Sequence, residues 1–310
     1  MPRCTIFVYF LYTRSSRRLG STQMRCVQMC QIMEQHGSGR FAYQEMRVPK
    51  FHISGLDCLW SAARPKDAIF IFVKNSIDRL SPSARAVLHR RAKAVVHDPI
   101  DRPIHATPLA HVDLHIASSL AQERALAACL AGRSRTGLLL HQPDLRLPEN
   151  PVTPSDRLRA AYFGDPVNAV LTEDIAARIS VIDVGLAADM LARLPLFAEA
   201  NMHYAVRPVP QISGTDVIKP LTKAMIAARC GVPVMINRDA HDAEALLGRD
   251  YPYLVDRPDP EQVLKTLDRA AGDFGGQSWT DAIDRMRALA SRVHPAQTAK
   301  DLEQLLEVAI

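Results

Sequence analysis

The chain has 310 residues, enough for two domains of about 150 residues each. Hydrophobic residues make up 47% of the sequence and charged residues 23%, as in ordinary folded domains with packed cores. The net charge of +5 is too small to indicate nucleic-acid binding, although it favours phosphorylated ligands or an anionic membrane surface. The six cysteines form no CxxC pair, so we expect reduced thiols in a cytoplasmic protein.

The apolar stretch at residues 5–12 predicts a first buried strand. Basic residues follow this stretch, whereas they precede the apolar part of a signal peptide. The stretch is also too short to span a bilayer, and no other segment has the length and hydrophobicity of a transmembrane helix.

Strands and helices alternate through the first half of the chain. Apolar runs predict the strands, and amphipathic or capped runs between them predict the helices. The predicted strands are 5–12, 41–48, 68–74, 92–98, 113–118 and 136–141, and the predicted helices are 21–36, 81–91 and 121–131. Repeated units of this kind predict a doubly wound parallel sheet.

A proline-rich segment at residues 147–156 separates this half from a second series of elements. The predicted strands there are 157–166, 180–184, 203–207, 232–236 and 253–255, and the predicted helices are 187–194, 224–230, 259–271, 279–292 and 296–308. We therefore predict an α/β protein with two doubly wound, Rossmann-like domains facing each other across a cleft. The predicted divisions are an N-terminal domain at 1–148, a linker at 149–157, a C-terminal domain at 158–295, and a final helix at 296–310.

Polar residues follow several of the predicted strands. Ligands of open α/β sheets bind outside the carboxyl ends of the strands, so these residues are candidates for a site. They are Lys74, His97, Asp98 and His141 in the first half, and Gly164, Asp165, Arg207 and Lys219 in the second.

Two lysines and a threonine gather where a helix is predicted to begin in the second half. Lys219, Thr222 and Lys223 surround Pro220, which the first turn of a helix accepts, and Gly231 fits the position after its end. A helix N-terminus attracts anions through its free N–H groups and its dipole. We interpret this segment as a diphosphate-binding site; the alternative is a solvated helix start with ordinary surface lysines.

Four motifs of the second half occur in order and at suitable spacing: YFGDP at 162–166, NMHYAVRP at 201–208, KPLTK at 219–223 and CGVPV at 230–234. Together they resemble the donor-binding half of GT-B glycosyltransferases, especially bacterial cell-surface polysaccharide enzymes. In the first half, LGSTQMR at 19–25 resembles the glycine-rich turn and arginine that open such enzymes, and FVK at 72–74, VHDP at 96–99 and ASS at 117–119 have counterparts there.

The resemblance implies a metal-independent hexosyl- or related transferase without a cofactor, in polysaccharide or glycoconjugate synthesis. Its donor would be a nucleotide sugar, and its acceptor a glycan, a lipid-linked molecule or a protein. The C-terminal domain would hold the donor through Gly164, Asp165, His203, Arg207, Lys219, Thr222 and Lys223. The N-terminal domain would meet the acceptor through Gly20, Ser21, Arg25 and His141. The final helix at 296–310 would pack back on this domain, as chain ends do in many GT-B proteins.

One departure from the family concerns the carboxylates that many retaining GT-B enzymes carry in a Glu-x7-Glu motif. The two corresponding positions hold Ile218 and Ile226. This leaves open a catalytically silent GT-B-like binding or scaffold protein. A nucleotide-sugar epimerase is a third reading, which needs acid and base carboxylates in the cleft.

The predicted catalytic residues are Asp98, His97 and Lys74. Histidine titrates near neutral pH and an adjacent carboxylate can orient a hydroxyl, but neighbours on a strand face opposite sides. The alternative is that Asp98 only turns the chain. Lys74 ends an apolar run, and we expect it to face the cleft because a buried unpaired lysine is costly.

Two further expectations concern partners. Three further histidines, His105, His111 and His115, lack a metal-site spacing with a carboxylate, so we predict no metal. The basic loop with Arg14, Arg17 and Arg18 suits a phosphorylated or lipid-linked acceptor or an anionic membrane, and a solvated loop is the alternative. The expected location is the cytoplasm, and the alternative is association with the inner face of the membrane.

Overall fold

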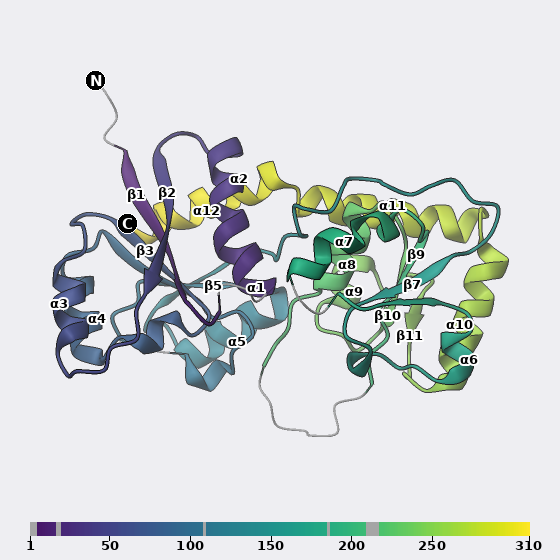
Figure 1. The fold of residues 1–310 in the computed structure, drawn as a ribbon, viewed down its shortest axis with the longest axis horizontal. Coiled ribbons are helices and arrows are strands. Elements are labelled where there is room, and N and C mark those ends of the chain that lie inside the picture. The colour runs from purple at the N-terminus through teal and green to yellow at the C-terminus, as the bar shows by residue number, and fades with distance from the viewer. Residues whose placement is uncertain (1–4, 17–19, 108–109, 185–186, 209–216) are drawn as a thin grey trace. The chain divides into compact units, whose positions relative to one another are not determined.

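The computed structural model describes residues 5–16, 20–107, 110–184, 187–208 and 217–310 (Figure 1). The chain divides into two compact units. Unit 1 comprises residues 1–141, 215–220 and 295–310, and unit 2 comprises residues 142–214 and 221–294. Part of the basic loop, Arg17 and Arg18, lies outside the described residues.

The described part of unit 1 is built on a six-stranded parallel sheet with the order β2-β1-β3-β4-β5-β6. Its strands are β1 (Ile6–Thr13), β2 (Phe41–Val48), β3 (Ile69–Val73), β4 (Ala94–Asp98), β5 (Leu114–Ala117) and β6 (Arg135–Leu138). Every residue of β3 and β4 is buried. Strands that are buried along their whole length are typical of a parallel sheet that is covered on both faces.

Helices connect these strands. They are α1 (Gly20–Thr22), the π-helix η1 (Gln23–Val27), α2 (Gln28–His36), α3 (Leu56–Ala62), η2 (Ser76–Arg79), α4 (Pro82–His89), η3 (Ile104–Ala106) and α5 (Leu120–Leu130). The helix predicted at 21–36 is therefore interrupted by a π-turn, and α3 was not predicted. Ser81 caps α4 as expected, since its side chain accepts a hydrogen bond from the N–H of Ala84.

The last helix, α12 (Pro295–Ala309), belongs to unit 1. The carboxylate of Glu303 accepts a hydrogen bond from the N–H of Ser38, just after α2, at 2.9 Å. A Cβ atom at Gly137 of β6 would meet Leu305 Cδ2, so the glycine leaves room for the Leu305 side chain of α12.

Unit 2 has a five-stranded parallel sheet in its described residues, with the order β11-β10-β9-β7-β8. Its strands are β7 (Ala160–Phe163), β8 (Ser180–Ile182), β9 (Met202–Tyr204), β10 (Val234–Asn237) and β11 (Leu254–Val255). Its helices are η4 (Pro166–Asn168), α6 (Glu173–Ala176), α7 (Ala187–Phe197), α8 (Thr222–Arg229), α9 (Ala243–Leu247), α10 (Pro260–Asp273) and α11 (Gln277–Arg292).

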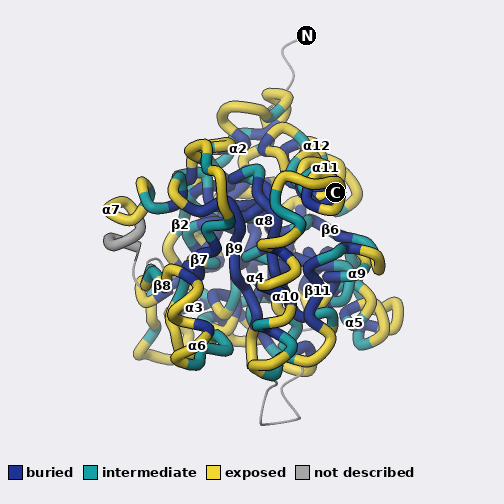
Figure 2. Tube along the Cα trace, turned by 90° about the vertical axis from the view of Figure 1, so that its right-hand side faces the viewer, coloured by how far each residue is buried: buried dark blue, intermediate teal, exposed yellow. Residues whose placement is uncertain are grey.

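Both sheets are doubly wound. In unit 1 the chain goes from β1 to one neighbour, β2, and then returns to the other, β3; in unit 2 it goes from β7 to β8 and returns to β9. Figure 2 shows central strands such as β7 and β9 in the dark blue of buried residues, with exposed residues on the surrounding helices. The predicted α/β fold with two Rossmann-like sheets is confirmed. Among the described residues, no helix has both the length and the hydrophobicity that crossing a bilayer requires.

Candidate functional site

The best candidate site lies in unit 2, where the strand order reverses between β7 and β9. Open α/β sheets bind ligands at such a switch point, outside the carboxyl ends of the strands. The chain leaves β7 at Gly164 and continues from β9 towards Arg207. Thr222 begins α8, and no side chain caps this helix start.

Lys223 is the central residue of this site. Its Nζ donates a hydrogen bond to the carbonyl oxygen of Phe163 and lies 4.1 Å from the centre of the Tyr162 ring. Burial lowers the pKa of Lys223 to about 7, and the positive charge of Arg207 contributes to the shift. In the described part of the chain no carboxylate forms an ion pair with this amine. The Lys223 amine therefore has no carboxylate counter-ion among the described residues.

Gly164 allows the close approach of these groups. A Cβ atom at this position would lie 2.7 Å from Lys223 Nζ and 2.8 Å from Tyr162 Oη, closer than real Cβ contacts come. The Tyr162 hydroxyl donates a hydrogen bond to the Asp165 carbonyl at 2.8 Å, which fixes the turn after β7. The predicted Gly164 is therefore brought together with Lys223, 59 residues later in the sequence.

His203 lies on β9 and is only 4% exposed. Its ring lies 4.9 Å from the Phe163 ring and 5.8 Å from the Phe197 ring, measured between centres. Burial lowers the pKa of His203 to about 3, and the charge of Lys223 adds to this effect. The imidazole is therefore neutral at physiological pH, and its Nε2 has no hydrogen-bond partner among the described residues.

Arg207 is held by a residue that the sequence analysis missed. Asn237, the last residue of β10, accepts a hydrogen bond from the Arg207 N–H at 2.7 Å and donates one to its carbonyl oxygen at 2.9 Å. The side chain of Arg207 is exposed. The predicted strand stopped at residue 236, one residue before Asn237. A polar residue directly after an apolar strand is the signal that could have identified Asn237.

The other predicted donor residues are arranged differently. Asp165 is exposed, and its carboxylate accepts a hydrogen bond from the N–H of Val167 at 3.1 Å, so it caps η4. Thr222 is half-buried at the start of α8. Lys219 is exposed and belongs to unit 1. The sequence analysis placed Pro220 in the first turn of this helix. In the structure Pro220 precedes the N-cap of α8.

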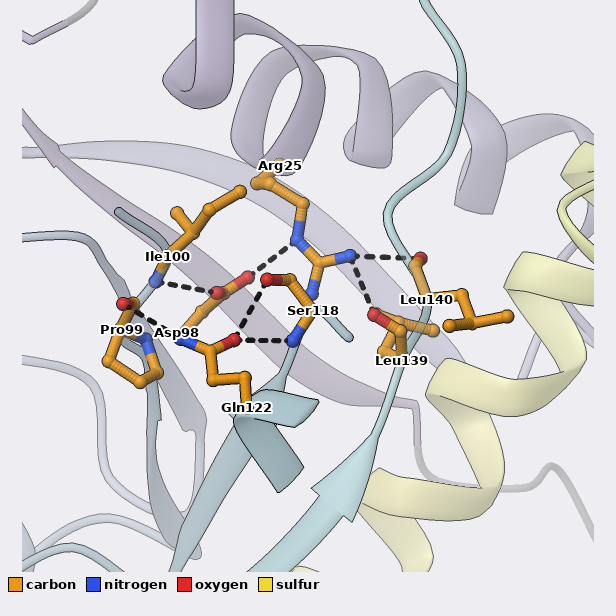
Figure 3. A network of polar contacts seen from close by, with 8 residues as sticks. All are labelled: Arg25, Asp98, Pro99, Ile100, Ser118, Gln122, Leu139 and Leu140. Atoms are coloured by element: carbon orange, nitrogen blue, oxygen red, sulfur yellow. Dashed lines mark hydrogen bonds and ion pairs between the residues drawn. The ribbon is translucent and has the colours of Figure 1, made fainter. Parts of the chain in front are cut away.

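The predicted acceptor-side arginine and the predicted base form a buried ion pair in unit 1 (Figure 3). Arg25 Nε donates to Asp98 Oδ2 at 2.7 Å, and both residues are buried. Arg25 Nη1 also donates to the carbonyl oxygens of Leu139 and Leu140, at 3.1 and 3.2 Å. The other carboxylate oxygen of Asp98 accepts a hydrogen bond from the N–H of Ile100 at 3.3 Å.

A second group of contacts extends this network. Gln122 Oε1 accepts hydrogen bonds from the N–H and hydroxyl of Ser118 at 2.7 and 2.8 Å, and Gln122 Nε2 donates to the Pro99 carbonyl at 3.2 Å. The network joins the carboxyl ends of β4, β5 and β6. Because Asp98 is buried and both its oxygens accept hydrogen bonds, the geometry favours a structural role over the predicted role as base.

The other predicted catalytic residues, His97 and Lys74, also form contacts with residues of unit 1. His97 is fully buried, and its Nε2 lies 2.9 Å from the Lys74 carbonyl oxygen. Burial lowers the pKa of His97 well below its usual value, and His115 beside it adds to the shift. The geometry therefore favours a neutral core histidine over a base.

Lys74 was expected as a lone charge, but it is paired. Its Nζ lies 3.2 Å from Asp101 Oδ2 and donates to the Ser21 hydroxyl at 3.3 Å. Lys74 and the predicted Ser21 are therefore brought together, next to the exposed Gly20. The last predicted acceptor residue, His141, is buried at the end of unit 1. Within the described ranges, no group of three or more His, Cys, Asp or Glu residues could hold a metal ion.

No family model and no curated protein sequence matches the chain. Solved structures do match it over nearly its whole length. The lipopolysaccharide outer core galactosyltransferase WaaB has a TM-score of 0.64 at 10% identity, over 98% of this chain and 100% of that chain. The sucrose-phosphate synthase from Thermosynechococcus elongatus has a TM-score of 0.63 at 12% identity, with the same coverage.

A third match is HepE from Anabaena in complex with UDP, with a TM-score of 0.61 at 13% identity, over 97% of this chain and 100% of that chain. The chain has the GT-B fold. The fold implied by the sequence resemblance is thus confirmed. At identities this low the likeness establishes the GT-B fold alone, and activity has to be argued from the site.

Proposed function

We propose that the chain is a glycosyltransferase that takes a sugar from a nucleotide-sugar donor and binds the donor diphosphate at the β7–β9 switch point of unit 2. The observation that supports this proposal is the half-buried Lys223 amine, which forms no ion pair with a carboxylate among the described residues. HepE, a protein of the same fold, is known in complexes with UDP and with UDP-glucose. UDP-sugars are therefore the first donors to test.

The chemistry of the transfer suits this arrangement. When the bond between the sugar C1 and the diphosphate oxygen breaks, the leaving diphosphate gains a negative charge. The Lys223 ammonium and the uncapped N-terminus of α8 would stabilise that charge. The acceptor hydroxyl oxygen forms the new bond to C1, and its proton passes to a base.

We further propose that Lys223 and Arg207 supply the positive charge at the diphosphate without a bound metal. The acceptor is a glycan, a lipid-linked molecule or a protein, on the side of unit 1. Lys74 and Ser21 follow β3 and β1 at the switch point of that sheet, so they are the described polar groups best placed to meet it.

Thermal unfolding with UDP-glucose, GDP-mannose, ADP-glucose and dTDP-glucose tests the donor site, because a ligand that binds only the folded protein raises its melting temperature. We expect one of these donors to stabilise the protein, and Lys223→Met to weaken its binding at least about tenfold, as loss of a charge-assisted contact does. Lys265→Met, at an exposed position of α10, is the matched control. Lack of stabilisation by every donor would contradict the proposal.

A catalytically silent GT-B protein is the second candidate. It is favoured by the engagement of Asp98 with Arg25, and by Ile218, which replaces a carboxylate and packs against the apolar cluster around Ile104 and Leu126. Release of nucleoside diphosphate from the bound donor, measured with membrane lipids or glycans as acceptors, separates the two. Donor binding without any release would favour the silent protein.

A further inference from the structure

Asn237 extends the pairing between β9 and β10 beyond the backbone ladder. The ladder between these strands ends at the pair formed by Tyr204 and Met235. Further along, the Asn237 side chain accepts a hydrogen bond from the Arg207 N–H at 2.7 Å and donates one to the Arg207 carbonyl at 2.9 Å. A side-chain amide carries the same kinds of donor and acceptor as a peptide group. Asn237 therefore holds the backbone of Arg207 as a neighbouring strand would.

The segment that leaves β9 is also held from the side of β7. The Val206 carbonyl accepts a hydrogen bond from the Val170 N–H at 3.0 Å, and the Tyr204 hydroxyl donates to the Val170 carbonyl at 2.6 Å. Asn237 is only 6% exposed, so the loss of either of its hydrogen bonds would leave a buried polar group without a partner. The backbone at Arg207 is therefore fixed from two sides.

The side chain of Arg207, in contrast, is exposed, and in the described part of the chain its guanidinium forms no ion pair. Burial and then the positive charge of Arg207 lower the pKa of Lys223, so the guanidinium acts on this amine. The other titratable groups around the amine are the Tyr162 ring at 4.1 Å and the neutral His203. A fixed backbone thus presents a second cation next to Lys223 at the β7–β9 switch point.

We propose that Asn237 is a positioning residue of the donor site: it fixes the Arg207 backbone so that the guanidinium and the Lys223 amine meet the diphosphate of the same donor. This role rests on the proposed function, because it requires a diphosphate at the switch point. An arginine whose backbone is already held loses less freedom when it binds a ligand. The alternative is that Asn237 only ends β10 and stabilises unit 2.

Asn201 offers a matched control in the same unit. It is also 6% exposed, its Oδ1 accepts a hydrogen bond from the Arg159 N–H at 2.7 Å, and its Nδ2 donates to the Arg157 carbonyl at 2.8 Å. These contacts lie at the amino ends of β7 and β9, opposite the donor site. Asn237→Ala and Asn201→Ala should therefore lower the urea midpoint by similar amounts, whereas only the positioning role changes donor affinity.

Calorimetric titration with UDP-glucose tests the role of Asn237 in a double-mutant cycle. We expect Asn237→Ala and Arg207→Gln each to weaken binding about tenfold, as the loss of one hydrogen bond to a charged group does. The double variant should bind no more weakly than Arg207→Gln alone, because Asn237 acts through Arg207. Asn201→Ala should bind as the parent protein does. Additive losses in the double variant, or an equal loss in Asn201→Ala, would overturn the proposal.

A titration without donor separates this role from the proposed function. In protein with isotope-labelled lysine, the nuclear magnetic resonance signal of Lys223 is identified by its absence in Lys223→Met, and its pH dependence gives the pKa. Asn237→Ala should raise this pKa, because the Arg207 charge is no longer held next to the amine, and Asn201→Ala should leave it unchanged. If no UDP-sugar binds the parent protein, the proposed function fails. An unchanged Lys223 pKa in Asn237→Ala would show that Asn237 does not position Arg207.

Discussion

At the scale of single residues, the donor site depends on the charge of one amine, that of the half-buried Lys223. The Lys223 pKa of about 7 means that the amine is largely neutral above neutral pH in the empty site. A bound diphosphate would favour the charged form and raise this pKa. Binding would then take up a proton.

The first prediction is a pH dependence of donor affinity. UDP-glucose keeps a constant charge near neutral pH because both its phosphates are esterified. The pKa of Lys223 is about 7 in the free protein and should be higher in the complex. The affinity for UDP-glucose should therefore be greatest below pH 7 and fall up to about tenfold per pH unit above it. Isothermal titration calorimetry in buffers of different ionisation enthalpy measures both the affinity and the proton uptake.

Lys223→Arg is the control for this pH dependence, because a guanidinium stays protonated at all these pH values. It should bind UDP-glucose with little change between pH values and without proton uptake. Proton uptake by the Arg variant, or constant affinity of the parent protein, would show that Lys223 does not titrate as expected.

The second prediction concerns Gly164. An alanine Cβ would collide with Lys223 Nζ and Tyr162 Oη, and such overpacking typically costs about 1–3 kcal/mol. We expect Gly164→Ala to lower stability in urea by this amount and to lose UDP-glucose binding. Gly272→Ala in α10 is the matched change, because a Cβ there meets no atom within 4 Å. Undiminished binding by Gly164→Ala would contradict the close approach.

At the scale of secondary-structure elements, the Arg25–Asp98 pair joins η1, β4 and the end of β6. Asp98→Asn would leave Arg25 buried without a counter-charge, which typically costs about 3–5 kcal/mol. We expect this loss in urea unfolding, and a smaller one in the double variant Arg25→Met/Asp98→Asn. Asp268→Asn is the control, since its exposed pair with Arg178 should contribute little to stability. A stable but inactive Asp98→Asn would restore the catalytic prediction.

The elements differ in how well the sequence predicts them. Both parallel sheets were predicted because the central strands, such as β3 and β10, are short apolar runs separated by helical segments. The short helix α3 was not, because its apolar residues lie both on the core side, at Trp60, and on the solvent side, at Leu59, so no helical periodicity stands out.

The site was predicted only in part, for a similar reason. Gly164 and Lys223 were identified from motifs, but no local pattern could show that Asp98 pairs with Arg25, 73 residues away. Likewise, the position of His203 beside the stacked rings of Phe163 and Phe197 depends on strand order and helix packing, which spacing in the sequence does not encode.

At the scale of the whole molecule, neither unit is a single stretch of chain. The predicted N-terminal domain was residues 1–148 with the final helix at 296–310 packed on it, and unit 1 comprises residues 1–141, 215–220 and 295–310, so residues 215–220 are the part that the prediction had given to the C-terminal domain. Leu302 of α12 is fully buried, so the C-terminal residues contribute to the core of the unit that begins the chain. Stability of unit 1 should therefore be sensitive to changes near the C-terminus.

The last prediction separates the two units by calorimetry. A protein with two units need not unfold in one step, and a perturbation confined to one unit then moves only its own transition. Leu302→Ala removes a buried side chain of unit 1 and should lower one transition, by about 2–5 kcal/mol. UDP-glucose should raise the other transition, because it binds folded unit 2. Val308→Ala, at a 53% exposed position of the same helix, should move neither. If Leu302→Ala and UDP-glucose shift a single shared transition, the two units unfold together. That outcome would contradict the prediction that α12 stabilises unit 1 alone.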